Sequence, residues 1–172
     1  CAGCYIFGWR VITLTAVCVS SCMIFEYLSR RIMKRSNTVT DLSAVVTGVL
    51  LAMNLPVTLP YWMAVIGCFV AIVIVKQLFG GLGQNFANPA ITARIVLMVS
   101  FPSAMSHWIQ PASYEYDAVS SATPLAMGEG AELPSYLDLL LGNVGGCLGE
   151  TCALALLAGG LYLAARRIIS LA

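Results

Sequence analysis

Five stretches of the chain are almost continuously apolar, and polar residues gather in the segments between them. The apolar stretches cover residues 11–28, 42–55, 61–75, 91–101 and 137–165. A helix needs about 20 mostly apolar residues to cross the hydrocarbon core of a bilayer. The pattern therefore predicts an all-α, multi-span membrane bundle with about five membrane segments. One interpretation of the fourth stretch, which is short and follows Asn88 and Pro89, is a broken or half helix.

Composition supports a membrane location. Hydrophobic residues make up 59% of the 172 residues and charged residues 10%, whereas soluble domains carry about 25% charged residues. A net charge of +1 provides no basic field for nucleic acid. The chain starts at Cys1 without a recognisable targeting signal. We therefore expect a single transmembrane domain over residues 1–172 that is an internal piece of a longer protein.

Lysine and arginine are distributed unevenly, and this predicts the orientation of the chain. One basic cluster contains Arg30, Arg31, Lys34 and Arg35. Cytoplasmic loops carry an excess of Lys and Arg, so we expect the basic cluster on the cytoplasmic side. Alternation of the spans then brings four more basic residues to that side: Lys76, Arg94, Arg166 and Arg167. The tryptophans, typical of membrane interfaces, all fall at the outer ends: Trp9, Trp62 and Trp108.

The predicted orientation places a long polar loop, residues 102–135, on the outer face. Loops longer than about 12–15 residues usually carry a function or are disordered. This loop contains the sequence DAVSSATPLA at residues 117–126. One interpretation is a turn in which Asp117 or Ser120 bonds to nearby backbone. The other is that Thr123, flanked by small residues, is a covalent attachment point, with Asp117 orienting the acceptor or holding a metal.

A second motif, KQLFGGLGQNFANPA, covers residues 76–90 and is expected on the cytoplasmic side. Its three glycines, Gly80, Gly81 and Gly83, would let backbone approach a ligand closely. Asn88 and the residues after it can begin a helix whose free N–H groups point at an anion or a polar ring. The alternative is a glycine-rich turn followed by an ordinary helix start with proline in its first turn.

The Asn-Pro-Ala sequence of this motif is also similar to that of the aquaporins, in which two half-helices meet in a pore. This similarity leaves a second function open. In that alternative the protein is a channel or transporter with a re-entrant half-helix and no redox role.

Glu150 is an ionisable residue in the middle of the fifth apolar stretch, within the glycine-rich sequence GNVGGCLGET at residues 142–151. A charge at the centre of a membrane helix costs about 2.5–3.5 kcal/mol on insertion scales, so such a residue is a candidate for function. We expect Glu150 either to lie on an ion path or to lock helices together. The glycines have the spacing of close helix contacts.

Several motifs, in their order along the chain, resemble the RnfD subunit of the Rnf ion-translocating electron-transport complex. They are residues 41–52, 55–56, 60–62, 76–90, 100–102 and 117–126. More distantly, they are similar to the NqrB subunit of the sodium-pumping NADH:quinone reductase. The resemblance extends from about Asp41 to the end of the chain.

The resemblance implies a covalent flavin. In that family the threonine of the outer motif carries FMN through a phosphoester bond, so FMN is expected on Thr123. A flavin transferase makes this bond outside the cytoplasm and recognises the preceding residues, here Asp117, Ser120, Ser121 and Ala122. Position 121 is often glycine in the family and is serine in this chain.

The resemblance also implies a function and partners. The chain would be a membrane flavoprotein subunit of the bacterial inner membrane, relaying electrons within a ferredoxin:NAD oxidoreductase coupled to sodium or proton translocation. It has no dinucleotide fingerprint and would not itself bind NAD. Its partners would be other membrane and iron–sulfur subunits and an outer-face flavoprotein subunit. Some members bind a second, noncovalent flavin such as riboflavin, for which the candidate residues are Gly80, Gly81, Gly83, Asn85 and Asn88.

Overall fold

The described part of the chain is helical apart from one short pair of strands, which confirms the predicted all-α class. The computed structural model describes residues 2–36, 39–109, 120–121, 135–142, 144–150 and 152–169. The first elements are α1 (Ala2–Phe7), α2 (Arg10–Ile32), the 3-10 helix η1 (Val39–Asp41) and α3 (Ser43–Met53). Next come α4 (Tyr61–Phe69), its π-helical continuation η2 (Val70–Gln77), α5 (Pro89–Ser100) and α6 (Pro102–Met105). The last are β1 (Trp108–Ile109), β2 (Ser120–Ser121), α7 (Tyr136–Leu141) and α8 (Ala153–Ala165).

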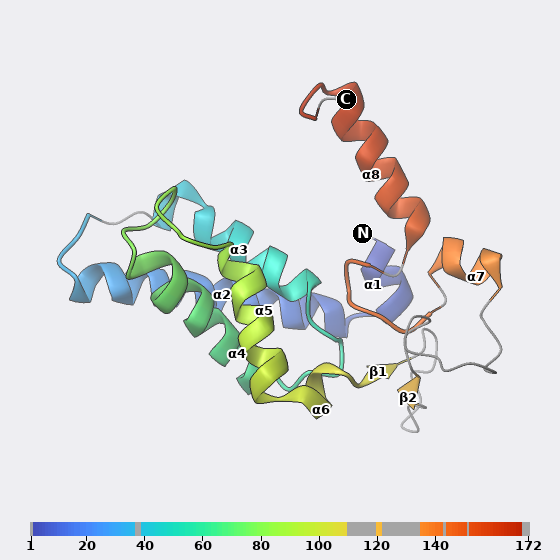
Figure 1. Cartoon of the computed structure of the whole chain (residues 1–172), viewed down its shortest axis with the longest axis horizontal. Helices are drawn as coiled ribbons and strands as arrows, with labels where there is room; N and C mark the ends of the chain where they lie inside the picture. Colours follow the sequence, from blue (N-terminus) through green and yellow to red (C-terminus); the bar gives the residue numbers. More distant parts are fainter. Residues whose placement is uncertain are drawn as a thin grey trace.

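Helix α2 is the element around which the bundle is built (Figure 1). It packs against α3, α4 and η2. Its buried apolar residues recur every three or four positions, as one face of a helix requires: Val11, Leu14, Cys18 and Cys22. Two of these side chains are cysteines, which behave here as small hydrophobic residues and let neighbouring helices come close.

Helix α3 approaches α2 most closely at Gly48. A Cβ atom at this position would lie 2.9 Å from the Cα atom of Val19 and 3.1 Å from the carbonyl oxygen of Cys18. Both neighbours are backbone atoms of α2, which cannot rotate out of the way as a flexible side chain would. The helix pair therefore depends on a residue without a side chain at position 48.

The helices differ in length from the predicted stretches: α2, α5 and α4 with η2 are longer, and α3 is shorter. Within the described residues, α2 alone is long and apolar enough to cross a membrane. Helix α3 has 11 residues and α5 has 12, which at 1.5 Å per residue is about 17–18 Å, against about 30 Å of hydrocarbon. Half-helix length was expected of the fourth apolar stretch, and α3 in the second stretch is equally short.

The prediction of one continuous fifth helix was wrong. Helix α7 ends at Gly142, whose φ of 90° lies in the left-handed region that glycine adopts readily. The next glycines each disfavour a helix by about 1 kcal/mol relative to alanine. The glycine-rich segment instead forms a hydrogen bond to the end of α3, in which Gly149 N donates to Met53 O at 2.9 Å. Helix α8 then begins at Ala153 and points away from the bundle (Figure 1).

The orientation argument uses tryptophans and basic residues, and these two types lie at opposite ends of α2. At one end, Arg10 Nη2 donates to Thr58 O at 3.5 Å, and Thr58 Oγ1 donates to His107 O at 2.9 Å. These contacts gather the chain next to Trp9 and Trp108. The basic cluster lies at the other end of α2, 23 residues and about 35 Å away. The compartment that each end faces stays a prediction.

Three basic residues predicted on the same side of the membrane as the basic cluster do not lie next to that cluster. Arg94 is in the middle of α5. Its Nη1 donates to Oδ1 of Asn54, the residue that ends α3 on its C-terminal side. Arg166 and Arg167 follow α8, outside the bundle (Figure 1). The side of the membrane on which these three residues lie stays a prediction.

The contact at Gly48 leads to a test with a matched control. We expect Gly48→Ala to lower the stability of the purified full-length protein by about 1–3 kcal/mol, because the new methyl group overpacks the backbone of α2. Gly159→Ala in α8, where a Cβ meets nothing within 4 Å, should cause no loss. Thermal unfolding in detergent measures both, and equal midpoints for the two variants would contradict the close-contact argument.

Candidate functional site

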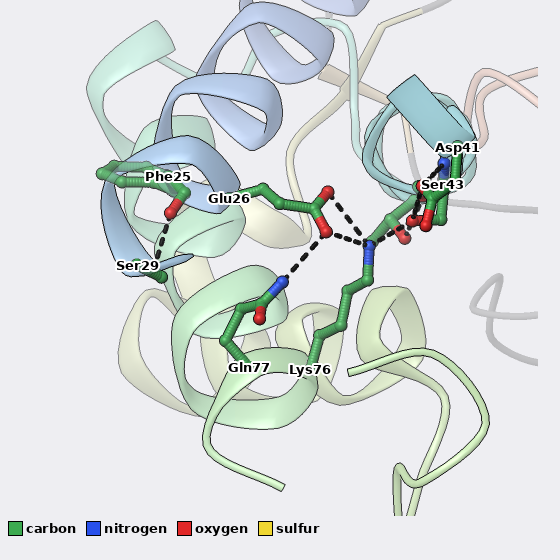
Figure 2. Close-up of polar contacts among 8 residues, drawn as sticks. Phe25, Glu26, Ser29, Asp41, Ser43, Lys76 and Gln77 are labelled. Carbon is green, nitrogen blue, oxygen red and sulfur yellow. Dashed lines mark hydrogen bonds and ion pairs between the residues drawn. The ribbon is translucent and has the colours of Figure 1, made fainter. Parts of the chain in front are cut away.

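A buried ion pair joins three helices at the end of the bundle that carries the basic cluster (Figure 2). Lys76 Nζ lies 3.0 Å from Glu26 Oε1 and 3.1 Å from Oε2, and the two side chains are 3% and 0% exposed. Gln77 Nε2 donates to the same Oε1 at 2.9 Å. Lys76 Nζ also donates to the hydroxyl of Ser43, on α3. The Glu26 carboxylate on α2 is thereby bonded to Lys76 and Gln77 of η2. Lys76 also bonds η2 to α3.

The π-helical geometry of η2 explains why two consecutive polar residues point into the core. Leu78 N donates to Val73 O, five residues earlier, at 3.1 Å. A π-helix has a wider turn than an α-helix, and such segments occur frequently at functional sites. The widened turn brings Lys76 and Gln77 side by side toward Glu26, as Figure 2 shows.

Asp41 extends this network to the start of α3 (Figure 2). Its Oδ1 accepts from Ser43 N at 2.9 Å and from Ser43 Oγ at 2.6 Å. These hydrogen bonds lower the pKa of the Asp41 carboxyl below its ordinary value, so it is ionised at neutral pH. With its proton directed to Asp41, the Ser43 hydroxyl presents its oxygen to Lys76.

The sequence argument did not identify this network, although its signal was present. Glu26 is the only charge in the first apolar stretch and Lys76 closes the third. Opposite charges at the cytoplasmic ends of two predicted spans are candidates for pairing. The contact joins residues 50 positions apart, so helix periodicity gave no indication of it.

A second polar group surrounds Arg94 near the other end of the bundle. Besides the hydrogen bond of Nη1 to Asn54, Nη2 donates to the Cys147 sulfur at 3.3 Å. Nη1 also lies 3.5 Å from Glu150 Oε1. Arg94 and Glu150 line a cavity of about 900 Å³, whose wall also includes Ser106 and Trp108.

Glu150 was predicted to lie in the middle of a membrane helix, and in the structure it does not. It follows the glycine-rich segment in a turn before α8, and its side chain is 62% exposed. Its carboxylate faces Arg94 across the edge of the cavity. Of the two interpretations, the contact supports a link between segments, and a role in an ion path stays a prediction.

The glycines at 80, 81 and 83 have a structural explanation. All three have a positive φ, of 116°, 108° and 84°, which glycine adopts without strain. A Cβ atom at Gly81 would also lie 2.6 Å from Arg30 Nη2. The side-chain nitrogen of Asn85, with the amide turned to face the carbonyls, donates to Val75 O and Gly81 O. The segment is therefore a tight turn closed by its own side chains.

The helix that follows this turn begins in the ordinary way. Asn88 is the N-cap of α5, and its Oδ1 accepts from Ala90 N at 3.0 Å and from Ile91 N at 3.4 Å. Pro89 occupies the first helical position, where a missing N–H costs nothing. The start of α5 thus has the form that the second interpretation describes, with its first N–H groups bonded by Asn88 itself. Flavin binding at these residues stays a prediction.

The described part of the outer loop brings one part of its motif beside the bundle. Ser120 and Ser121 form β2, which pairs antiparallel with β1, so that Ser121 is opposite Trp108 and Ser120 opposite Ile109. Trp108 lines the cavity beside Arg94. Asp117, Ala122 and the predicted attachment residue Thr123 lie outside the described residues.

Comparison with known families decides what kind of protein carries these features. The family model described as NQR2, RnfD, RnfE matches residues 1–172. The chain belongs to this family. Its predicted resemblance to the RnfD subunit of the Rnf complex is confirmed, and the all-α fold is that of a membrane subunit family.

Three curated relatives show the extent of the similarity. The D subunit of the Na⁺-translocating ferredoxin:NAD⁺ oxidoreductase complex of Acetobacterium woodii is 51% identical over 96% of this chain and 53% of the relative. The proton-translocating counterpart of Clostridium ljungdahlii is 37% identical over 98% and 54%. The D subunit of the ion-translocating oxidoreductase complex of Rhodobacter capsulatus is 42% identical over 98% and 56%. The chain thus spans about half the length of these relatives.

The buried ion pair predicts a large effect of a single charge change. Glu26→Gln leaves the Lys76 ammonium buried without a carboxylate, so we expect a loss of about 3–5 kcal/mol in stability. The double variant Glu26→Gln/Lys76→Met should lose less than the single variant, because no unpaired charge remains. Thermal unfolding of the purified full-length protein measures both.

An exposed pair in the same chain provides the control. Glu150→Gln removes the carboxylate facing Arg94, and for a pair this exposed the expected change is within about 1 kcal/mol. A loss as small in Glu26→Gln as in Glu150→Gln would show that the buried pair does not hold the helices together.

Proposed function

We propose that this chain forms part of the D subunit of an ion-translocating ferredoxin:NAD oxidoreductase and relays electrons through an FMN bonded to Thr123. The observation that carries the proposal is similarity to the D subunits of three named complexes over nearly the whole chain. The predicted attachment motif at residues 117–123 is the reason for proposing FMN as the cofactor. The complex would lie in a bacterial inner membrane, with the Thr123 loop on the outer face.

The cavity beside β1 has the chemistry that a flavin ring requires. Its volume of about 900 Å³ is within the usual range of 300–1,000 Å³ for a small-molecule site. Met98, Met105 and Leu139 provide apolar walls for a planar ring, and Arg94 provides hydrogen-bond donors for its polar edge. A bound flavin would supply one- and two-electron transfer, and the chain would supply position and charge.

The chain's own residues would have distinct tasks in this function. Trp108 and Ser106 border the cavity on the side of the β1–β2 pair. Asn54 and Cys147 hold the Arg94 guanidinium in place. Glu150 is our candidate for an ion path, because its exposed carboxylate opens onto the same cavity. The coupling ion would be sodium or a proton, since the relatives' names include both.

The remaining parts of the proposal follow the family. A flavin transferase would attach the FMN, and the chain would assemble with other membrane and iron–sulfur subunits and with an outer-face flavoprotein subunit. A second, noncovalent flavin would lie against the glycine turn at residues 80–83. The channel alternative has less support, because the relatives that match nearly the whole chain are D subunits of oxidoreductase complexes.

The covalent bond is tested by flavin fluorescence on a denaturing gel. Denaturation removes noncovalent flavin, so the wild-type protein co-expressed with the transferase should give a fluorescent band. Thr123→Ala should abolish the band completely, because it removes the hydroxyl that forms the phosphoester. Protein staining of the same gel measures the amount of protein in each lane.

A second threonine provides the control for this experiment. Thr58 lies near β1, where its hydroxyl donates to His107 O, and Thr58→Ala should keep the band. A wild-type protein without fluorescence, with the transferase active on another substrate, would refute the covalent relay. Solute flux without an electron donor would then favour the channel.

A further inference from the structure

We propose that Arg94 and Glu150 form an opposed pair of charges that sets the reduction potential of a flavin ring in the cavity. Arg94 would face the electron-rich carbonyl edge of the ring and favour its reduced form, and Glu150 would weaken that effect. The inference rests on the proposed function, since it requires the covalent FMN, but it assigns roles to residues outside the attachment motif.

The cavity is bordered by segments that come together only in the folded chain. Arg94 comes from α5, Ser106 follows α6, Trp108 belongs to β1, and Glu150 precedes α8. The β1–β2 pair places Ser121 opposite Trp108. The predicted attachment residue is two positions after Ser121 in the sequence. The cavity is therefore bordered by the strand that pairs with the attachment motif.

The Arg94 guanidinium is oriented before any ligand binds. Nη1 donates to Asn54 Oδ1 at 2.9 Å and Nη2 donates to the Cys147 sulfur at 3.3 Å. A guanidinium has five N–H donors, so these contacts fix the group and leave donors for a ligand. Its side chain is 28% exposed, which keeps it partly shielded from water. A fixed, partly desolvated cation interacts more strongly with a nearby charge than a mobile surface cation does.

The direction of the effect follows from charge. Reduction increases the electron density of the ring at its nitrogen–carbonyl edge, so a cation there stabilises the reduced form relative to the oxidised form. Glu150 Oε1 lies 3.5 Å from Arg94 Nη1 and offsets part of the positive charge. Removal of Arg94 should therefore lower the potential, and removal of the Glu150 carboxylate should raise it.

These opposite directions separate the inference from a structural role. The pair also links the glycine-rich segment to α5, and loss of either partner would loosen that link in the same way. A structural effect would thus move the potential in one direction in both variants. An electrostatic effect moves it in two directions.

The experiment is a spectroelectrochemical titration of the covalent flavin in the purified complex. We expect Arg94→Gln to shift the oxidised-to-reduced ratio about tenfold toward the oxidised form, which for a two-electron couple is about 30 mV. Glu150→Gln should shift the ratio toward the reduced form. Arg94→Lys, which keeps the charge, should lie closer to the wild type than Arg94→Gln.

A remote arginine and the denaturing gel complete the design. Arg31, which bonds to Tyr27 at the other end of α2, is the control, and Arg31→Gln should leave the potential unchanged. A fluorescent band with potentials that stay the same or move together in the Arg94 and Glu150 variants would overturn this inference alone. If Arg94→Gln does not fold, the upward shift in Glu150→Gln decides. A wild-type chain without a fluorescent band would overturn both proposals.

Discussion

The buried contact between Glu26 and Lys76 constrains the arrangement of the bundle more than any other interaction that the structure describes. Two fully buried charges are stable only while each has the other, because a lone buried charge loses its hydration without compensation. The pair joins α2 to η2, and Ser43 adds α3. Any sliding of these helices would separate the charges. The close approach at Gly48 acts on the same helices, so the sliding and the separation of α2 and α3 are both restricted.

The other end of the bundle is held differently. Helix α3 ends at Met53. The glycine-rich segment bonds to the exposed end of α3 through Gly149 and Met53. Arg94 then joins α5 to both segments through Asn54 and Cys147. The cavity lies between α5 and this glycine-rich segment, whose residues Gly145 and Gly146 form part of its wall.

The sequence predicted the fold class and the family because both depend on local patterns. Apolar runs located the helices up to residue 101, and the motifs identified relatives of the Rnf type. The fifth helix was mispredicted because hydrophobicity does not register the conformational preference of Gly142 and its neighbours. The pairing of Glu26 with Lys76, and the position of Arg94 against Asn54, depend on contacts between distant segments, which no local pattern encodes. The motif around Thr123 was recognised from its sequence, and Thr123 itself lies outside the described residues.

The two ion pairs differ in a way that suits two tasks. The Glu26–Lys76 pair is dry, so a change of either charge is costly and the pair is suited to holding a fixed arrangement. The Arg94–Glu150 pair is 3.5 Å apart and partly exposed, so its interaction is weaker and more easily altered. The proposed tuning of a flavin depends on this difference, because Asn54 and Cys147 fix the Arg94 guanidinium while Glu150 offsets only part of its charge. The stronger pair, at the other end of α2, holds the helices in place.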